Sequence, residues 1–245
     1  MVIHPTALIS PEASIAKNVE IGPFCIVHDN VKIAEGCKIG SHCELGVKTS
    51  LGDGSPLIIG ENAQIRSHSV FYESSQFGTG LVTGHRATVR ELTKAGKNLQ
   101  IGTQTDIQGT VEIGDYTRFH SNVFVGQHMI FGDFVWVFPH VVFTNDPHPP
   151  SNHLVGSSIR DFAAIGAKST ILPGLEIGKG ALVAAASVVT RDVGEDRIAL
   201  GHPAKDSGPT SSVMRSDAPA EKAYPWRRHF RRGYPENVVK KWLSG

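Results

Sequence analysis

The stretch from Ile15 to Leu45 reads IAKNVE IGPFCI VHDNVK IAEGCK IGSHCE L, in blocks of six that each open on an aliphatic residue. A period of six matches neither an amphipathic helix nor a plain alternating strand. It fits a three-sided prism of short parallel strands, with three blocks per 18-residue coil and coils stacked at about 4.8 Å. The series begins at Ile3, and further series with this spacing begin at Ile59, Ile101 and Ile159. The sequence therefore predicts an all-β parallel β-helix of hexapeptide repeats, with about nine to ten coils.

A second inward position lies two residues before each aliphatic anchor, because alternate strand residues face the same side. It is small or β-branched in most blocks and includes Cys25, Cys37 and Cys43. We expect these cysteines to be small core residues. A Cys25–Cys43 bridge is geometrically conceivable, since residues 18 apart lie in adjacent coils. Nothing in the cysteine pattern predicts a zinc site.

Composition narrows the function classes. The 245 residues carry 24 Lys and Arg against 23 Asp and Glu, which argues against a nucleic-acid binder. No apolar run approaches the roughly 18 residues of a membrane span, and the first residues lack a signal-peptide pattern. We therefore expect a cytoplasmic protein with no membrane span and no nucleic-acid partner. Positive charge is concentrated in residues 221–245, where seven basic side chains face two acidic ones.

Interruptions of the repeat divide the chain. A polar stretch from Val47 to Leu57 and a proline-rich stretch at 144–158 are expected to leave the prism as loops. We predict a β-helix domain over 1–204, a linker over 205–220 rich in Ser, Pro, Asp and Gly, and a basic aromatic extension over 221–245. The extension is expected to be partly helical from Pro235 onward.

The closing coils carry the most specific motif. The segments Ile165–Gly174, Ile177–Val193 and Gly201–Lys205 resemble the end of the hexapeptide acyltransferases that use acyl-CoA. The resemblance covers about residues 3–204 and implies a left-handed β-helix. It also implies that small residues line the pantetheine arm of acetyl-CoA or another acyl-CoA, and that a basic side chain meets the phosphates. The matching positions are Gly166, Ala184 and Ala185 for the arm and Arg191 for the phosphates.

Acyl transfer from a thioester needs a base, and histidine suits this task because its pKa lies near 6.5. His85 is followed by Arg90 and Glu91, a pattern that resembles the nucleotide-sugar branch of the hexapeptide acyltransferases. The segment around His120 and the segment 136–146 resemble the same branch. We expect the base to be His85 or, next, His120, with Arg90 and Glu91 holding or orienting the substrate.

Register supplies another candidate base. His128 and Asp146 are 18 residues apart, so they would be neighbours if the loop has not yet left the prism at Asp146. A carboxylate beside an imidazole orients it and raises its basicity. The resemblance further assigns Asn145, with His148 close by, to substrate binding.

The leading hypothesis is an acyltransferase that moves an acetyl or similar short acyl group from acyl-CoA to an amino group of a nucleotide-linked sugar, with no metal. Large apolar residues outside the inward positions predict a homotrimer, because neighbouring prisms would cover them. These residues are Phe124, Phe134, Trp136 and Phe138.

Three alternatives remain open. The first coils resemble acyl-carrier-protein-dependent UDP-N-acetylglucosamine O-acyltransferases. A γ-type carbonic anhydrase would need three zinc-binding histidines, for which His120, His148 and His153 are available. The β-helix could also be a non-catalytic assembly module.

Overall fold

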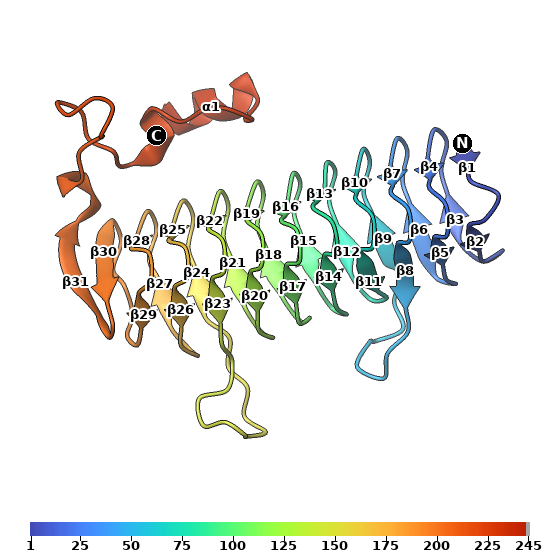
Figure 1. Ribbon diagram of the computed structural model, residues 1–245, viewed down its shortest axis with the longest axis horizontal. Helices are drawn as coiled ribbons and strands as arrows, with labels where there is room; N and C mark the ends of the chain where they lie inside the picture. The colour runs from blue at the N-terminus through green and yellow to red at the C-terminus, as the bar shows by residue number, and fades with distance from the viewer. Residues whose placement is uncertain (244–245) are drawn as a thin grey trace.

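The computed structural model describes residues 1–243 and shows a long three-sided column with a C-terminal segment folded back along one face (Figure 1). Three parallel sheets of 12, 10 and 9 strands form its sides, here called sheets A, B and C. Sheet A contains eleven parallel strands before its last, antiparallel one, so the left-handed β-helix has about 11 turns, slightly more than expected.

The strands are short and regularly spaced. Sheet A comprises β1 (Val2–Ile3), β4 (Glu20–Ile21), β7 (Lys38–Ile39), β10 (Gln64–Ile65), β13 (Val82–Thr83), β16 (Gln100–Ile101), β19 (Arg118–Phe119), β22 (Trp136–Val137), β25 (Ala164–Ile165), β28 (Leu182–Val183), β30 (Arg197–Gly201) and β31 (Ala204–Pro209). Sheet B comprises β2 (Leu8–Ile9), β5 (Ile26–Val27), β8 (Glu44–Val47), β11 (Val70–Tyr72), β14 (Thr88–Val89), β17 (Asp106–Ile107), β20 (Phe124–Val125), β23 (Val142–Phe143), β26 (Thr170–Ile171) and β29 (Val188–Val189). Sheet C comprises β3 (Ser14–Ile15), β6 (Val31–Ile33), β9 (Leu57–Ile59), β12 (Gln76–Phe77), β15 (Lys94–Ala95), β18 (Glu112–Ile113), β21 (Ile130–Phe131), β24 (Ser158–Ile159) and β27 (Glu176–Ile177).

Register confirms the coil length of 18. Ile3 pairs with Ile21 and Ile101 with Phe119, while the two loops lengthen single coils. Lys38 therefore pairs with Gln64 across the first loop. Both loops leave the column at the edge where sheet B turns into sheet C, and they project from the same side (Figure 1).

The second inward position has a role that the sequence did not reveal. Its hydroxyl or thiol donates a hydrogen bond to a backbone carbonyl one coil onward. Thr117 Oγ1 lies 2.8 Å from the Gly132 oxygen, and Thr105 Oγ1 lies 2.8 Å from the His120 oxygen. The Sγ of Cys37 lies 3.1 Å from the Gly60 oxygen in the same way. All three cysteines are free and buried, as expected of core residues.

We expect Thr117→Val to lower the free energy of unfolding by about 1–3 kcal/mol, because it leaves a buried carbonyl and the Val135 N–H without their partner. Urea unfolding measures the change. The matched control is Thr79→Val, on an exposed hydroxyl. Equal stability of the two variants would show that the buried hydroxyl bond contributes nothing.

The C-terminal part corrects two expectations. Residues 204–209 form strand β31, which pairs with β30 and closes the end of the column, so the expected linker begins as sheet. Beyond it lie η1 (Thr210–Ser212), η2 (Trp226–Arg228) and α1 (Glu236–Leu243). The segment from Tyr224 to α1 covers part of sheet A.

This segment forms an aromatic cluster with sheet A that is separate from the core of the prism. Phe134 stacks on Tyr116 and Phe162, and Trp136 Nε1 donates to the Tyr234 hydroxyl at 2.9 Å. The expectation that Phe134 and Trp136 face a neighbouring chain is therefore wrong, since the chain's own C-terminal segment packs on both.

Candidate functional site

The structure distributes the predicted site residues over two edges of the prism. The A–B edge, where each sheet A strand turns into sheet B, carries one set. Its members are His85, His120, Gly166, Ala184 and Ala185. The B–C edge carries the other set, together with the two loops. Its members are Arg90, Glu91, His128, Asn145, Asp146, His148 and Arg191.

Small residues follow His120 along the A–B edge, one coil above another. The ring of His120 stacks on Phe138 at 5.0 Å between centroids, and the next coils place Gly166 and Ala184 in the same column. A Cβ on Gly166 would lie 2.5 Å from the Ala185 nitrogen, so only glycine fits there. We call this run, Gly166 with Ala184 and Ala185, the donor lane, after the role that the resemblance in the sequence predicts for it.

His120 is half-buried on this edge. Burial lowers its pKa below the ordinary value of 6.5, and the nearby Arg118 lowers it further. Its ring also lies 5.7 Å from that of Trp136. Both effects favour the neutral imidazole, which is the form that a general base requires.

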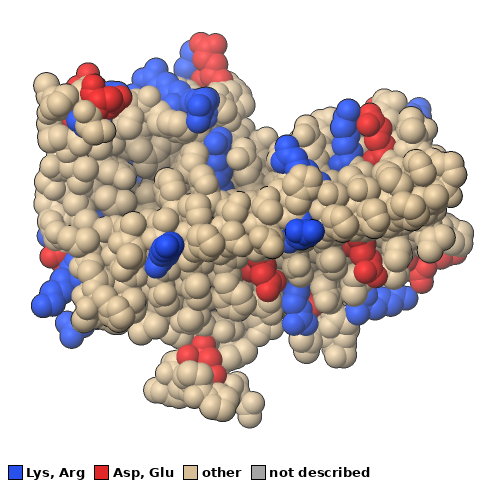
Figure 2. Space-filling view, in the orientation of Figure 1, with Lys and Arg blue, Asp and Glu red and all other residues tan. Residues whose placement is uncertain are grey.

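A cleft of about 420 Å³ adjoins His120 and is bounded by sheet A and the C-terminal segment. We call it the arginine cleft, because Arg66, Arg118 and Arg232 line it. An aromatic pocket of about 320 Å³ lies beside it and shares Trp136, Phe230 and Arg232 with it. The surface is hollowed between the C-terminal segment and the column (Figure 2).

His85 lies two coils away from His120 and is exposed. Its Nδ1 is 2.8 Å from the Ser67 hydroxyl oxygen, and it lines an open hollow with Lys38 and Gln64 that shares Arg66 with the arginine cleft. It lacks the desolvating neighbours of His120. The two candidate bases are thus in different surroundings on one edge.

On the B–C edge, Glu91 is only 1% exposed and forms an ion pair with Arg90 at 3.2 Å. Arg90 also lies over the Tyr72 ring, 5.4 Å from its centroid. The buried carboxylate of Glu91 therefore orients the guanidinium of Arg90, which is the more exposed of the two side chains.

The predicted stacking of Asp146 on His128 is wrong. The chain leaves the prism after Asn145 and returns at Val155, whose N–H donates to the Asn145 carbonyl at 2.7 Å. Gly156 occupies the position against His128. The Asp146 carboxylate instead accepts hydrogen bonds from the Ser151 hydroxyl and from the Ser151 and His148 N–H groups. These contacts lower the pKa of Asp146, which organises the loop.

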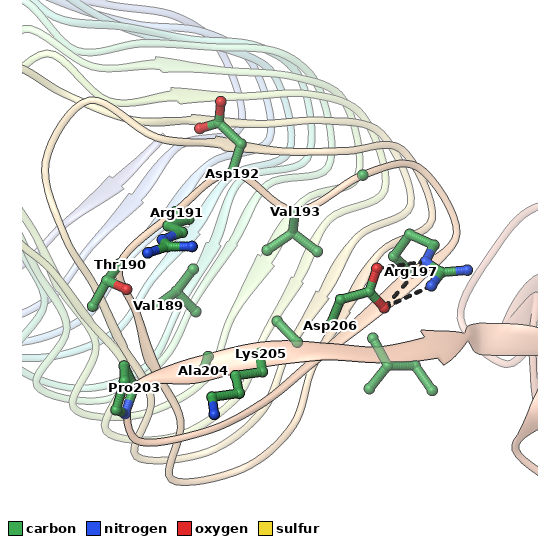
Figure 3. Close-up of a pocket in the computed structure, with 13 residues that line it drawn as sticks. Val189, Thr190, Arg191, Asp192, Val193, Arg197, Pro203, Ala204, Lys205 and Asp206 are labelled. Atoms are coloured by element: carbon green, nitrogen blue, oxygen red, sulfur yellow. Dashed lines mark hydrogen bonds and ion pairs between the residues drawn. The ribbon is translucent and has the colours of Figure 1, made fainter.

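Arg191 lies in an end pocket of about 350 Å³, where strand β31 closes the column (Figure 3). Lys205 also lines it, while Arg197 is held by Asp206 at 2.8 Å. Neither Arg191 nor Lys205 forms an ion pair within residues 1–243. In this part of the chain the end pocket thus contains two cations without an ion pair, together with the carboxylate of Asp192.

The three histidines considered for zinc do not converge. His148 and His153 lie in the loop at the B–C edge, whereas His120 lies on the A–B edge. Within the described part of the chain, no three His, Cys, Asp or Glu side chains are placed to share a metal ion. Residues 1–243 also contain no helix with the length and apolar character to span a membrane.

Sequence reasoning missed the arginine cleft. Arg66 and His120 are 54 positions apart, three coils, so the register alone places them in one column. That signal was available. The sequence contains no such signal for Phe230 and Arg232, because their position depends on how the C-terminal segment folds back.

Comparison with known proteins agrees with the repeat architecture. Residues 2–46 match the family described as bacterial transferase hexapeptide (six repeats). An acyl-[acyl-carrier-protein]–UDP-N-acetylglucosamine O-acyltransferase of Thermodesulfovibrio yellowstonii is 35% identical over 89 residues, 36% of this chain and 34% of that protein. The corresponding protein of Bartonella quintana is 31% identical over 113 residues, 44% of this chain and 38% of that one. The chain thus matches just over a third of the length of these relatives.

A solved structure agrees on the fold. That of an Arabidopsis UDP-N-acetylglucosamine acyltransferase superimposes with a TM-score of 0.58 at 19% identity, over 98% of this chain and 80% of that one. At this identity the likeness concerns the fold alone.

Proposed function

We propose that this hexapeptide-repeat protein is an acyltransferase that moves an acyl group from a phosphopantetheine thioester to a nucleotide-linked sugar. The observation that carries the proposal is His120, a half-buried imidazole with a lowered pKa, between a lane of small residues and a cationic cleft. The names of the curated relatives support a hydroxyl acceptor and an acyl-carrier-protein donor.

In the proposed reaction, His120 takes the proton from the attacking sugar hydroxyl, and the oxygen of that hydroxyl bonds to the thioester carbonyl carbon. The carbon–sulfur bond then breaks, and the imidazolium returns the proton to the leaving thiolate. Burial keeps His120 neutral before the reaction. His85 is the second candidate base, and its exposed position makes it the weaker one.

N-acylation from acyl-CoA is the second candidate function. The end pocket favours it, because Arg191 and Lys205 line it at the end of the column and are suited to hold the phosphates of CoA. An acyl-carrier protein would bring no such nucleotide.

A four-way assay tests the two candidates. Acetyl-CoA and an acyl-carrier-protein thioester are each combined with UDP-N-acetylglucosamine and with a panel of amino-sugar nucleotides, and thiol release is followed. Turnover with the carrier-protein thioester and UDP-N-acetylglucosamine supports the first candidate. Turnover with acetyl-CoA and an amino sugar supports the second, and no turnover in any arm contradicts both.

Ala185→Leu is expected to raise the donor KM at least about tenfold with little change in stability, because the exposed side chain would fill the donor lane. Initial rates at varied donor concentration measure it. The control is Ala34→Leu, on a partly exposed alanine where sheet C turns into sheet A in an early coil, which should leave the donor KM unchanged. If Ala185→Leu raised the KM of the acceptor and left the KM of the donor unchanged, the assignment of the donor lane would be wrong.

The two edges cannot form one site within a single chain, because they lie on different corners of the prism. We propose that a homotrimer brings the B–C edge of a neighbour, with Arg90, Asn145 and His148, to His120. Exposed Phe124 and Phe138 remain apolar contacts for such packing. Activity regained on mixing His120→Ala with Asn145→Ala subunits would support this, and an active monomer in sedimentation would contradict it.

A further inference from the structure

The arginine cleft holds a cation, Arg118, that has no counter-charge among residues 1–243. The Arg118 guanidinium lies between two rings, 4.7 Å from the centroid of Trp136 and 4.4 Å from that of Tyr234. One terminal nitrogen donates to the Gly233 carbonyl at 3.2 Å, but Nε is buried with no hydrogen-bond partner. Burial lowers the pKa of Arg118, which shows that its environment disfavours the charge.

No acidic side chain lines this cleft. Arg66 donates only to the Thr83 carbonyl, and Arg232 lies near the Phe230 ring. Within residues 1–243, none of the three arginines forms an ion pair. Buried charges in proteins are normally paired, because removing them from water is costly. Arg118 is partly buried, whereas Arg66 and Arg232 are exposed, so the cost of an unpaired buried charge falls on Arg118. Because three arginines and no carboxylate line one cleft, the cleft favours an anion from outside the chain.

The surroundings indicate which anion. A diphosphate carries enough charge and enough acceptor oxygens for several arginines, which bind phosphate through two parallel N–H groups. The adjoining aromatic pocket, lined by Tyr224, Trp226 and Phe230, offers faces for a planar ring. Basic side chains also gather on the C-terminal segment above it (Figure 2).

We propose that the arginine cleft binds the diphosphate of the nucleotide-linked acceptor, with the base in the aromatic pocket. This inference rests on the proposed function, because only that function makes the bound nucleotide the acceptor substrate. It assigns the C-terminal segment to substrate binding and gives roles to Arg66, Arg118 and Arg232. The cleft adjoins His120, so a sugar attached to this diphosphate lies within the reach of the base.

CoA also contains a diphosphate and is the competing source of the same chemistry. The resemblance assigns its phosphates to Arg191, which lines the end pocket and not the arginine cleft. Titration of the full chain with UDP, inorganic pyrophosphate and CoA separates these sources. No turnover is needed, so the binding result is independent of the proposed reaction.

Calorimetry on the wild type is expected to show UDP binding about tenfold tighter than pyrophosphate, because the base adds stacking. Arg66→Gln and Arg232→Gln should each weaken UDP binding at least about tenfold and leave CoA binding unchanged. The matched control is Arg228→Gln, which removes the same charge from an exposed site outside the cleft. His120→Ala should keep UDP binding while losing turnover.

Three outcomes would overturn the inference. The first is UDP affinity that is equal in the wild type, Arg66→Gln and Arg232→Gln. The second is loss of CoA binding in these variants with UDP binding intact, which would place the donor in the cleft. The third is absence of binding by all three ligands, with tryptophan fluorescence showing that the C-terminal segment is still seated.

Discussion

His120→Ala is expected to lower kcat by about 10²–10⁴-fold, the usual contribution of a positioned general base. The physical reason is the environment of the ring, since Phe138 and Trp136 desolvate it and Arg118 lowers its pKa further. Steady-state rates with the thioester donor that works in the four-way assay measure the loss. The donor KM should change little, because the imidazole is not part of the donor lane.

His85→Ala is the informative comparison for this prediction. The exposed His85 should contribute less than about tenfold. A larger loss in His85→Ala than in His120→Ala would exchange the two assignments. His120→Gln, which keeps the size of the side chain without its basicity, separates a lost base from a lost contact.

The pH profile provides a second measurement of the same base. Because the pKa of His120 lies below 6.5, the neutral imidazole persists to more acid solution than an ordinary histidine allows. The acid limb of kcat/KM should therefore fall below pH 6.5 and the profile should be level above it. An acid limb at pH 7 or higher would contradict the assignment.

Trp226→Ala is expected to release the C-terminal segment from sheet A. Trp226 packs against Trp136, Phe162 and Trp242, and its Nε1 donates to the Phe162 carbonyl at 3.1 Å. Truncation of such a tryptophan costs about 3 kcal/mol or more. Trp226 also contacts Phe230, Tyr234 and Trp242 of the segment itself. It therefore lies at the centre of the segment's aromatic contacts, and its loss should unseat the segment.

The prism itself should survive this substitution, because the aromatic cluster is separate from the prism core. Limited proteolysis should cleave the segment that follows Pro209 much faster than in the wild type. The main thermal transition should stay within a few degrees of the wild-type value. The affinity for UDP should decrease, because release of the segment removes Phe230 and Arg232 from the arginine cleft. A main transition lowered by ten degrees or more would show that the two clusters unfold as one unit.

The sequence by itself determined the column. Anchors six residues apart and register partners 18 apart follow from short-range repetition, and every coil repeats the same local rule, so Ile21, Ile101 and Phe119 lie where the count predicts. Gly166 and Ala184 keep the same register, but the role proposed for them came from the resemblance to acyl-CoA-dependent acyltransferases and not from the count.

Tertiary structure alone decided the remainder. Asp146 leaves the prism because ten residues enter between Asn145 and Gly156, and a loop of that length has no period to read. Phe134 and Trp136 are covered by a segment about 90 residues further along the chain. The docking of this segment depends on the fit of one aromatic surface to another, which produces no periodic pattern in the sequence. The arginine cleft therefore exists only in the folded chain, where Arg66 and Arg232 line the same cleft.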